Sequence, residues 1–235
     1  MSPDVNDPRV AAGMAAQFAL RKRRIAAGEK PIGWKVGFGA KAAMEKLGTS
    51  APLIGFLTSA GLLQSGDAVS LKGWTHPVGE PELAVHIEDD LAGDASDATV
   101  EAAIAGLAPA IELANLDPAP DRVETILSGN IYHRHVIVGA LDRSRSGGSV
   151  TGLRAHVIRN GEEVASQSAL EANTGRIVAI VRHVADVLAH HGERLAAGEF
   201  IIAGAVTPPL FLDSRDRELV HHVDGLGNVS VRFAP

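Results

Sequence analysis

The segment from residue 80 to 87 alternates between two kinds of side chain. One set of alternate positions is apolar: Leu83, Val85 and Ile87. The other set is mostly polar: Glu80, Glu82, Ala84 and His86. A period of two is typical of a β-strand whose apolar face packs against a core, and a helix would scatter these side chains around its axis. The pattern therefore predicts a strand over Pro81–Ile87 with two carboxylates on one face.

Strand patterns are common in the rest of the chain, but they do not alternate regularly with helix patterns. Helical spacing predicts long helices over 10–27 and 177–188 and short ones over 41–47 and 100–107. Further strands are predicted over 34–38 and 108–113, with hairpins over 154–165 and 219–233. Asn160-Gly161 is the turn signal of the first hairpin. This order indicates an α+β fold and argues against a doubly wound parallel sheet.

The composition narrows the kinds of partner and of site. With 28 acidic and 22 basic residues the formal charge is −6, which argues against a nucleic-acid-binding protein. The short basic run at 21–24 is best explained as a solvated helix face. The chain has no cysteine, so disulfides, zinc–thiolate sites and thiol nucleophiles are excluded. Any metal must therefore be bound by carboxylate, imidazole, backbone carbonyl or water.

The expected location is the cytoplasm. Residues 1–10 are polar and lack the apolar stretch of a secretory signal. No apolar run approaches the length of a membrane span, so we expect no contact with a membrane.

Glu80 and Glu82 are the first candidates for a chemical role. Residues two apart in a strand point to the same side, so these carboxylates share a face. Two such charges repel and raise each other's pKa unless a cation lies between them. A hard divalent cation suits these oxygen ligands. On these two residues alone, however, a solvent-exposed acidic face is the favoured interpretation.

Glu112 lies in the otherwise apolar stretch 108–114. Burying an unpaired carboxylate is costly, so Glu112 needs a basic residue, backbone donors or a metal as a partner. The pattern leaves a buried ion pair and a metal ligand as equal alternatives.

Lys35 stands between two glycines in the stretch Gly33–Gly37. Such a lysine either reaches water or sits in a pocket as an acid, base or charge partner, and an ordinary surface lysine is favoured on the pattern alone. The histidine pairs 133/135, 190/191 and 221/222 lack the spacing and acidic partner of a zinc motif. We expect most histidines at the surface or at interfaces. No serine nucleophile elbow or nucleotide-binding glycine motif is present.

Several of these stretches together resemble one known family. They are Gly33-Trp34-Lys35-Val36-Gly37, Glu80-Pro81-Glu82-Leu83-Ala84, Ile111-Glu112, residues 197–204 and residues 225–231. In this order they are similar to the fumarylacetoacetate hydrolase superfamily, in the branch of 2-oxopent-4-enoate hydratase and 4-oxalocrotonate decarboxylase. The resemblance covers the chain from residue 32 onward. It implies an N-terminal helical segment, residues 1–31, followed by a catalytic domain, residues 32–235.

The resemblance implies a mostly β mixed sandwich or roll of the type of that family's C-terminal domain, with flanking helices. Glu80, Glu82 and Glu112 match the carboxylates that hold Mg²⁺ or Mn²⁺ in the family. Lys35 matches the family's lysine, which transfers a proton or neutralises substrate charge. A homo-oligomer, at least a dimer, is also implied. The residues that bind the substrate are not assigned.

Two stretches depart from the hydratase pattern. Hydratases of this branch carry an aspartate in Pro-Asp-Phe/Tyr-Gly, whereas here the match is Pro52-Leu53-Ile54-Gly55. Residues 114–122 lack the usual Asp-Ser-Arg pattern. The Asn-Tyr-x-x-His segment of the hydrolase branch is also absent, which argues against C–C bond hydrolysis by a histidine-activated water.

The expected function is that of a metal-dependent lyase acting on a small 2-oxo acid. The reaction is hydration of a 2-hydroxy-2,4-dienoate (a 2-oxo-4-enoate), as in aromatic catabolism, or decarboxylation of a related oxo-diacid. Both need metal-stabilised enolate chemistry, so the carboxylates do not separate them. The alternative is a non-catalytic binding or structural subunit. Leu53 supports that alternative, and the complete set of carboxylates with Lys35 opposes it.

Overall fold

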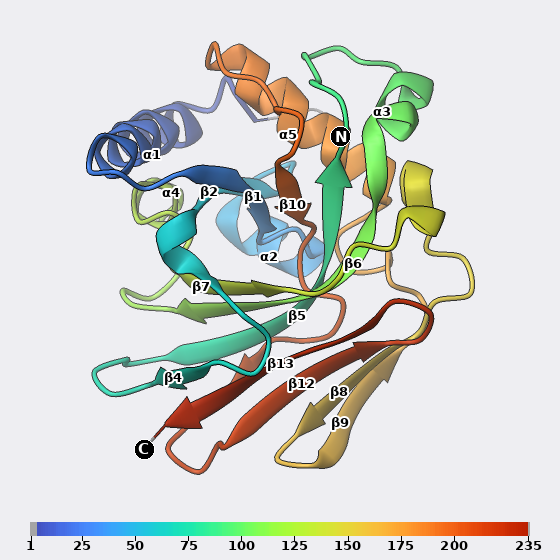
Figure 1. Ribbon diagram of the computed structural model, residues 1–235. Helices are drawn as coiled ribbons and strands as arrows, with labels where there is room; N and C mark the ends of the chain where they lie inside the picture. The colour runs from blue at the N-terminus through green and yellow to red at the C-terminus, as the bar shows by residue number, and fades with distance from the viewer. Residues whose placement is uncertain (1–3, 235) are drawn as a thin grey trace.

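A computed structural model describes residues 4–234 and contains two β-sheets with helices around them (Figure 1). The larger, eight-stranded sheet has the order β2-β1-β10-β5-β6-β7-β3, with β11 paired to β5. Its strands are β1 (Pro31–Gly37), β2 (Leu53–Thr58), β3 (Leu62–Leu63), β5 (Pro77–Ile87), β6 (Ile104–Asn115), β7 (His133–Val138), β10 (Phe200–Ile202) and β11 (Leu210–Phe211). It is a mixed sheet, since β1–β10 and β3–β7 are parallel and the other pairs are antiparallel.

The smaller, five-stranded sheet has the order β4-β13-β12-β8-β9. Its strands are β4 (Ala68–Ser70), β8 (Ala155–Arg159), β9 (Glu162–Gln167), β12 (Glu218–Val223) and β13 (Gly227–Ala234). The helices are α1 (Pro8–Ala26), α2 (Lys41–Leu47), α3 (Asp97–Ala103), α4 (Val123–Ser128) and α5 (Ile177–His190), with 3₁₀ turns η1 (Ser59–Gly61) and η2 (Arg143–Gly148). The predicted α+β class and mixed β architecture with flanking helices are confirmed.

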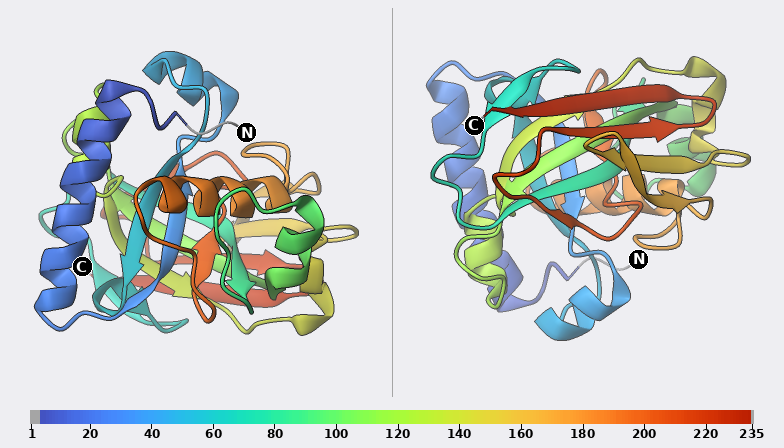
Figure 2. Two further views of the ribbon diagram at one scale, coloured as in Figure 1. Left: turned by 90° about the horizontal axis from the view of Figure 1, so that it is seen from above. Right: turned by 90° about the horizontal axis from the view of Figure 1, so that it is seen from below.

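The helices and the smaller sheet pack against different parts of the larger sheet. Figure 2 shows α1 and α5 on one side of the molecule and the red strands β12 and β13 on the other. Ile111, Leu113 and Ile137 of the larger sheet pack against Leu219 and Val231 of the smaller one. Residues of α1 and α5 form the main core with the part of β5 that contains Leu83 and Val85. Leu83 and Val85 share one face of the sheet with Ile111 and Leu113, so the helices cover one part of this face and the smaller sheet covers another. All of β6 is buried.

The larger sheet also curls on itself. Leu57 of β2 and Val136 of β7 belong to one cluster with Ala84, Ala110 and Ile202, although β2 and β7 lie near opposite ends of the strand order. Side chains on the concave face of β1, β5, β6 and β7 therefore point toward a common interior. The strand alternation over Pro81–Ile87 is confirmed, but the polar face lines this interior, where Glu82 is buried and Glu80 is half-buried.

The N-terminal helix agrees with its prediction to within two residues. The Asp7 carboxylate accepts a hydrogen bond from the backbone N–H of Arg9 and caps the helix. Val10, Met14 and Phe18 join the main core. The basic run at 21–24 is solvated only in part, because Arg21 lies 4.8 Å from the centroid of the Trp34 ring.

The helix predicted over 100–107 is wrong in its second half. The helix spans Asp97–Ala103, capped by Ser96, and β6 begins at Ile104. Gly106 explains the difference, because its φ is +155° and a Cβ there would lie 2.2 Å from the carbonyl oxygen of Asp142. The backbone of Gly106 thus pairs closely with the segment after β7, which a helix would prevent.

Both predicted hairpins are present. Asn160 and Gly161 have φ values of +53° and +85° and connect β8 to β9, as a type I′ turn requires. The second hairpin joins β12 to β13. Between residues 4 and 234, no helix combines the length and apolar character needed to cross a membrane.

Candidate metal centre

Glu80, Glu82 and Glu112 converge in the interior of the curled sheet. Glu80 and Glu82 lie two residues apart on β5, and Glu80 is directly opposite Glu112 in the antiparallel register with β6. Residues directly opposite in a sheet have their side chains on the same face. One carboxylate oxygen from each residue lies within 4.8 Å of the others.

The three carboxylates do not carry equivalent charges. Burial, followed by the charges of Glu112 and Glu80, raises the pKa of Glu82 well above its usual value. Burial and the charge of Glu112 raise the pKa of Glu80 to about 7. Without a cation, the cluster therefore holds protons near neutral pH. Glu82 also accepts a 2.7 Å hydrogen bond at Oε2 from the backbone N–H of Gly204.

Glu112 is the charged member of the cluster. Burial opposes its ionisation, but the Lys35 ammonium and the hydrogen bond from His133 outweigh burial and lower the pKa of Glu112. Both partners use the same oxygen: Lys35 Nζ lies 2.5 Å and His133 Nδ1 2.8 Å from Oε1. Oε2 is buried and has no hydrogen-bond partner among the described residues. The ion pair that the sequence left as an alternative is therefore present, and it leaves one oxygen available for a ligand.

Lys35 is buried, with 1% of its surface exposed, so the favoured interpretation of an ordinary surface lysine is wrong. It lies on β1 opposite Gly55 of β2, where a Cβ would come within 2.9 Å of Lys35 Cγ. Gly55 thus makes room for the lysine side chain. Besides Glu112, Nζ donates to the carbonyl oxygen of Ile131 at 3.1 Å. Two of its three N–H donors have partners among the described residues.

A left-handed turn places two of these partners. Asn130, Ile131 and Tyr132 have φ values of +57°, +50° and +61°, which is unfavourable for isoleucine in particular. The Asn130 side chain holds the turn against β2: its Oδ1 accepts from Phe56 N at 2.8 Å and its Nδ2 donates to Phe56 O at 2.9 Å. The turn directs the Ile131 carbonyl toward Lys35 and begins the strand that carries His133.

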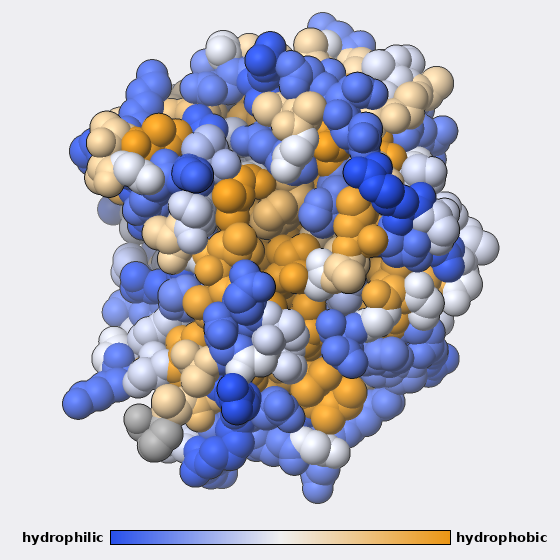
Figure 3. Space-filling model, viewed as in Figure 1, coloured by the Kyte–Doolittle hydropathy of each residue, from blue (hydrophilic) through white to orange (hydrophobic). Residues whose placement is uncertain are grey.

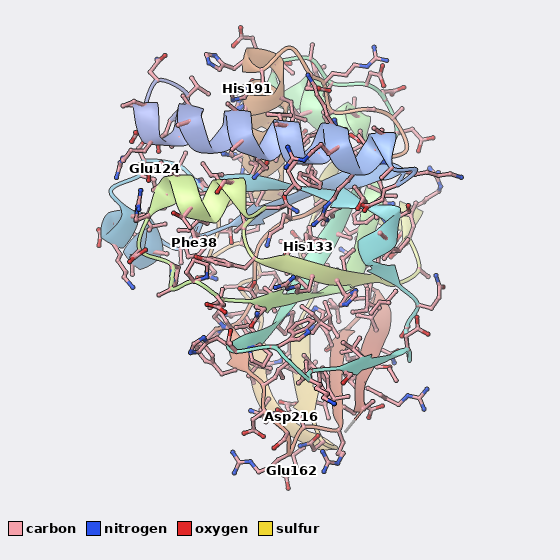
Figure 4. The ribbon with its side chains drawn as sticks, turned by 90° about the vertical axis from the view of Figure 1, so that its left-hand side faces the viewer. Phe38, Glu124, His133, Glu162, His191 and Asp216 are labelled. Atoms are coloured by element: carbon pink, nitrogen blue, oxygen red, sulfur yellow. The ribbon has the colours of Figure 1, made fainter. Side chains whose placement is uncertain are left out.

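The sequence did not identify His133 as a site residue, because most histidines were expected at the surface or at interfaces. It is 8% exposed and lies among the strands in the interior of the molecule (Figure 4). Burial lowers the pKa of His133, so the neutral ring donates from Nδ1 to the ionised Glu112. His183 and His221 are also buried, whereas the other histidines are exposed or half-buried, so the expectation for most histidines is not contradicted. No local spacing relates His133 to Glu112, since the contact depends on the pairing of β6 with β7.

A cavity of about 360 Å³ opens beside the cluster. Lys35 and Glu80 line it where it meets the carboxylate cluster, and this part of the cavity is here called its inner end. Its apolar walls are formed by Phe38, Ala40, Ala43, Val78, Leu116, Ile131, Pro208 and Pro209, and its uncharged polar residues include Tyr132, Asn173 and Thr174. The Tyr132 hydroxyl is buried and has no partner among the described residues. These residues supply the candidate substrate contacts that the sequence left unassigned.

Leu53 lies outside the lining of this cavity. It is 3% exposed and lines a separate space of about 20 Å³ with Met14, Leu127 and His183. The leucine thus fills a hydrophobic core between β2 and the helices. It does not leave a gap in the wall of the large cavity.

We expect Leu53→Asp to destabilise the protein by about 3 kcal/mol or more, because the carboxylate would enter an apolar core. Leu53→Met keeps the volume and should cost less than about 1.5 kcal/mol. Urea unfolding of the two variants measures the difference. Equal stability of Leu53→Asp and wild type would show that position 53 accepts an acid. The placement of Leu53 in a hydrophobic core would then be wrong.

Comparison with known proteins finds relatives over most of the chain. No protein-family model matches the chain. A 4-oxalocrotonate decarboxylase from Pseudomonas putida is 28% identical over 222 residues, covering 92% of this chain and 83% of the relative. A 2-hydroxyhexa-2,4-dienoate hydratase from Comamonas testosteroni is 27% identical over 238 residues, covering 97% and 88%.

A solved structure extends the similarity to the whole described fold. The 4-oxalocrotonate decarboxylase of Pseudomonas putida G7, in complex with magnesium and adipate, superposes with a TM-score of 0.87. Its sequence is 27% identical, and the alignment covers 100% of this chain and 90% of that one.

Proposed function

Because the chain belongs to the 2-oxopent-4-enoate hydratase and 4-oxalocrotonate decarboxylase branch of the fumarylacetoacetate hydrolase superfamily, we propose that it is a divalent-metal-dependent lyase acting on a small 2-oxo acid. The observation that carries the proposal is the convergence of Glu80, Glu82 and Glu112 beside Lys35 at the inner end of a cavity. The non-catalytic alternative depended on Leu53. Since Leu53 lies outside that cavity, we do not retain it.

We assign the metal, Mg²⁺ or Mn²⁺, to Glu80, Glu82 and Glu112. The donor set fits such an ion, because it consists of carboxylate oxygens and includes the buried, unpartnered Oε2 of Glu112. Burial, followed by the charges of Glu112 and Glu80, raises the pKa of Glu82, and a dication would offset the part that comes from the neighbouring charges. The ion would supply Lewis acidity toward the 2-oxo group of the substrate.

Lys35 is assigned the proton-transfer or charge-neutralising role. Its ammonium is fixed by Glu112 and the Ile131 carbonyl, which leaves one N–H for the cavity that Lys35 lines. A lysine held in this way can donate to a carboxylate or oxo oxygen of the substrate without reorganisation. Surrounding hydrocarbon excludes water and strengthens that interaction.

Tyr132 is assigned as a second hydrogen-bond donor to the substrate. Burial, followed by the charges of Asp121 and Asp117, raises the pKa of Tyr132 to about 12, so the hydroxyl stays protonated. We expect Tyr132→Phe to reduce kcat/KM by about 10- to 100-fold, the effect of losing a hydrogen bond to a charged group. Folding stability should be unchanged or slightly higher, because a buried unpartnered hydroxyl is removed. Steady-state kinetics and urea unfolding measure the two effects. A loss of stability with unchanged kinetics would assign Tyr132 to the fold alone.

The proposed function is tested with a panel of 2-hydroxy-2,4-dienoates and oxo-diacids, assayed with Mg²⁺ and with Mn²⁺ after chelation. Hydration is followed as loss of dienoate absorbance and decarboxylation as release of CO₂. Metal-dependent turnover that disappears in Glu82→Gln supports the proposal. Turnover that survives complete chelation, or none on any member of the panel, contradicts it.

We also propose that the protein acts in the cytoplasm, in aromatic catabolism, as a homo-oligomer. Phe211 is 63% exposed, and Figure 3 shows a band of apolar side chains across one face of the molecule. Such surface favours association. Light scattering at micromolar concentration should give at least twice the 24.5 kDa of one chain. A monomer would refute this proposal.

We further propose that the chain divides into an N-terminal helical segment, residues 1–31, and a catalytic domain, residues 32–235.

A further inference from the structure

The outer part of the cavity differs in chemistry from its inner end. Glu80 and Lys35 mark the inner end, whereas hydrocarbon from Phe38, Val78 and Leu116 lines the walls. A ligand whose 2-oxo acid group faces Lys35 and Glu80 would therefore extend its remaining carbons along an apolar surface. An uncharged hydrocarbon tail gains from leaving water there.

Lys35 is the one cationic residue among the described residues that line the cavity. Its Nζ donates to Glu112 Oε1 and the Ile131 carbonyl, and its one remaining N–H is assigned to the 2-oxo acid group at the inner end. A second carboxylate on the ligand would consequently lose water without gaining an ionic partner in the cavity wall. Burying a carboxylate in this way is strongly unfavourable.

The negative charges near Tyr132 also disfavour binding of a second carboxylate. After burial, Asp121 and Asp117 are the causes that raise the pKa of Tyr132, so both carboxylates exert their field at this wall of the cavity. They belong to the segment 116–122, which connects β6 to α4. A negative field at the wall disfavours a dicarboxylate and has little effect on a hydrocarbon tail.

We propose that the substrate is a 2-oxo monocarboxylate with a short uncharged hydrocarbon tail, and that the cavity discriminates against a second carboxylate. The inference rests on the proposed function and narrows it. It favours hydration of a monocarboxylic 2-hydroxy-2,4-dienoate over decarboxylation of an oxo-diacid.

Two inert analogues of equal carbon number test the inference, namely 2-oxohexanoate and 2-oxoadipate. They differ by a methyl group and a carboxylate at the far end. Isothermal titration of each into the Mg²⁺-loaded protein should give a Kd at least about tenfold lower for 2-oxohexanoate. Equal or tighter binding of 2-oxoadipate would overturn the inference and leave the proposed function intact. Failure of both analogues to bind in the presence of Mg²⁺ would overturn both.

Variants in and near the wall of the cavity test whether charge determines the preference between the two analogues. Leu116→Arg places a cation beside the tail, and Asp121→Asn removes an acidic charge from an exposed position. Each should shift the ratio of the two Kd values toward 2-oxoadipate, by about tenfold for Leu116→Arg. Val164→Arg, at an exposed position of β9, is the matched control and should leave the ratio unchanged. An unchanged ratio in both wall variants would overturn the inference.

Discussion

Replacing Lys35 with methionine is expected to lower turnover by about 10²- to 10⁴-fold, the usual contribution of a positioned acid or base. The same change removes the ammonium that lies 2.5 Å from Glu112 and leaves that carboxylate buried without its main counter-charge. Breaking a buried pair in this way costs about 3–5 kcal/mol. We therefore expect the metal-free variant to unfold at a markedly lower temperature.

Added Mg²⁺ should reverse much of this loss of stability. The cation can replace the positive charge that Lys35 supplied, so the metal-induced rise in Tm should be larger in Lys35→Met than in wild type. Lys72→Met, at an exposed lysine, is the control and should change neither turnover nor the rise in Tm. A Lys35→Met variant with normal turnover would remove the catalytic assignment, and one with a smaller rise in Tm would place Lys35 among the groups that support metal binding.

The second large effect is the pH dependence of folding stability in the absence of metal. The pKa of Glu80 is raised to about 7 from a usual value of 4.5, so the folded state holds a proton that the unfolded chain releases. The resulting stability is fully present below about pH 4.5 and is lost as the pH rises through 7. Over this pH range, Glu80 alone changes the free energy of unfolding by at most about 3 kcal/mol. Glu82 adds to it in the same direction.

Glu112 has the opposite effect, at lower pH. Its pKa is lowered, so the stability that it contributes is present above about pH 4.5 and is lost as the pH falls through its folded-state pKa. Urea unfolding in a chelator between pH 5 and 8 should therefore show a stability that declines with pH. Mg²⁺ at 100 times its Kd should add about 2.7 kcal/mol. At a fixed Mg²⁺ concentration the gain should increase with pH, because the ion binds the deprotonated carboxylates and its Kd falls as they lose their protons.

Glu80→Gln provides the control for this linkage. The amide has nearly the same shape and does not titrate, so the variant should lose the part of the slope between pH 5 and 8 that Glu80 contributes and keep the part that comes from Glu82. A wild-type profile in chelator that is flat over this range would show that the carboxylates do not repel one another, and the close cluster would then be in doubt.

Part of this site could be predicted from local patterns. The period of two along β5 is enough to place Glu80 and Glu82 on one face, and the apolar setting of Glu112 requires a partner for it. The long helices and the hairpin turn at Asn160-Gly161 are also local signals, since each depends on neighbours within one or two turns of chain.

The remaining features depend on contacts between distant residues. Lys35 and Glu112 are 77 positions apart, and their contact requires the curl that brings β1 toward β6. A lysine between glycines does not reveal this, because the pattern is the same at a surface. The turn at 130–132 was also missed, since isoleucine and tyrosine rarely adopt a positive φ and tertiary contacts must hold them there. The surroundings of Leu53 could not be predicted either, because a comparison with a family motif does not reveal the apolar space that this side chain lines.

The two carboxylate oxygens of Glu112 have different partners, and this difference affects the motion of the larger sheet. Oε1 is held from two directions by β1 and β7, so the side chain has already lost most of its rotational freedom before any ligand arrives. An ion bound at Oε2 would then join β5 and β6 to a framework that already includes β1 and β7. Local opening of these four strands would require release of the ion as well as rupture of hydrogen bonds. Amide exchange in the centre of the larger sheet should accordingly slow on metal binding, while exchange in the β8–β9 hairpin should change little.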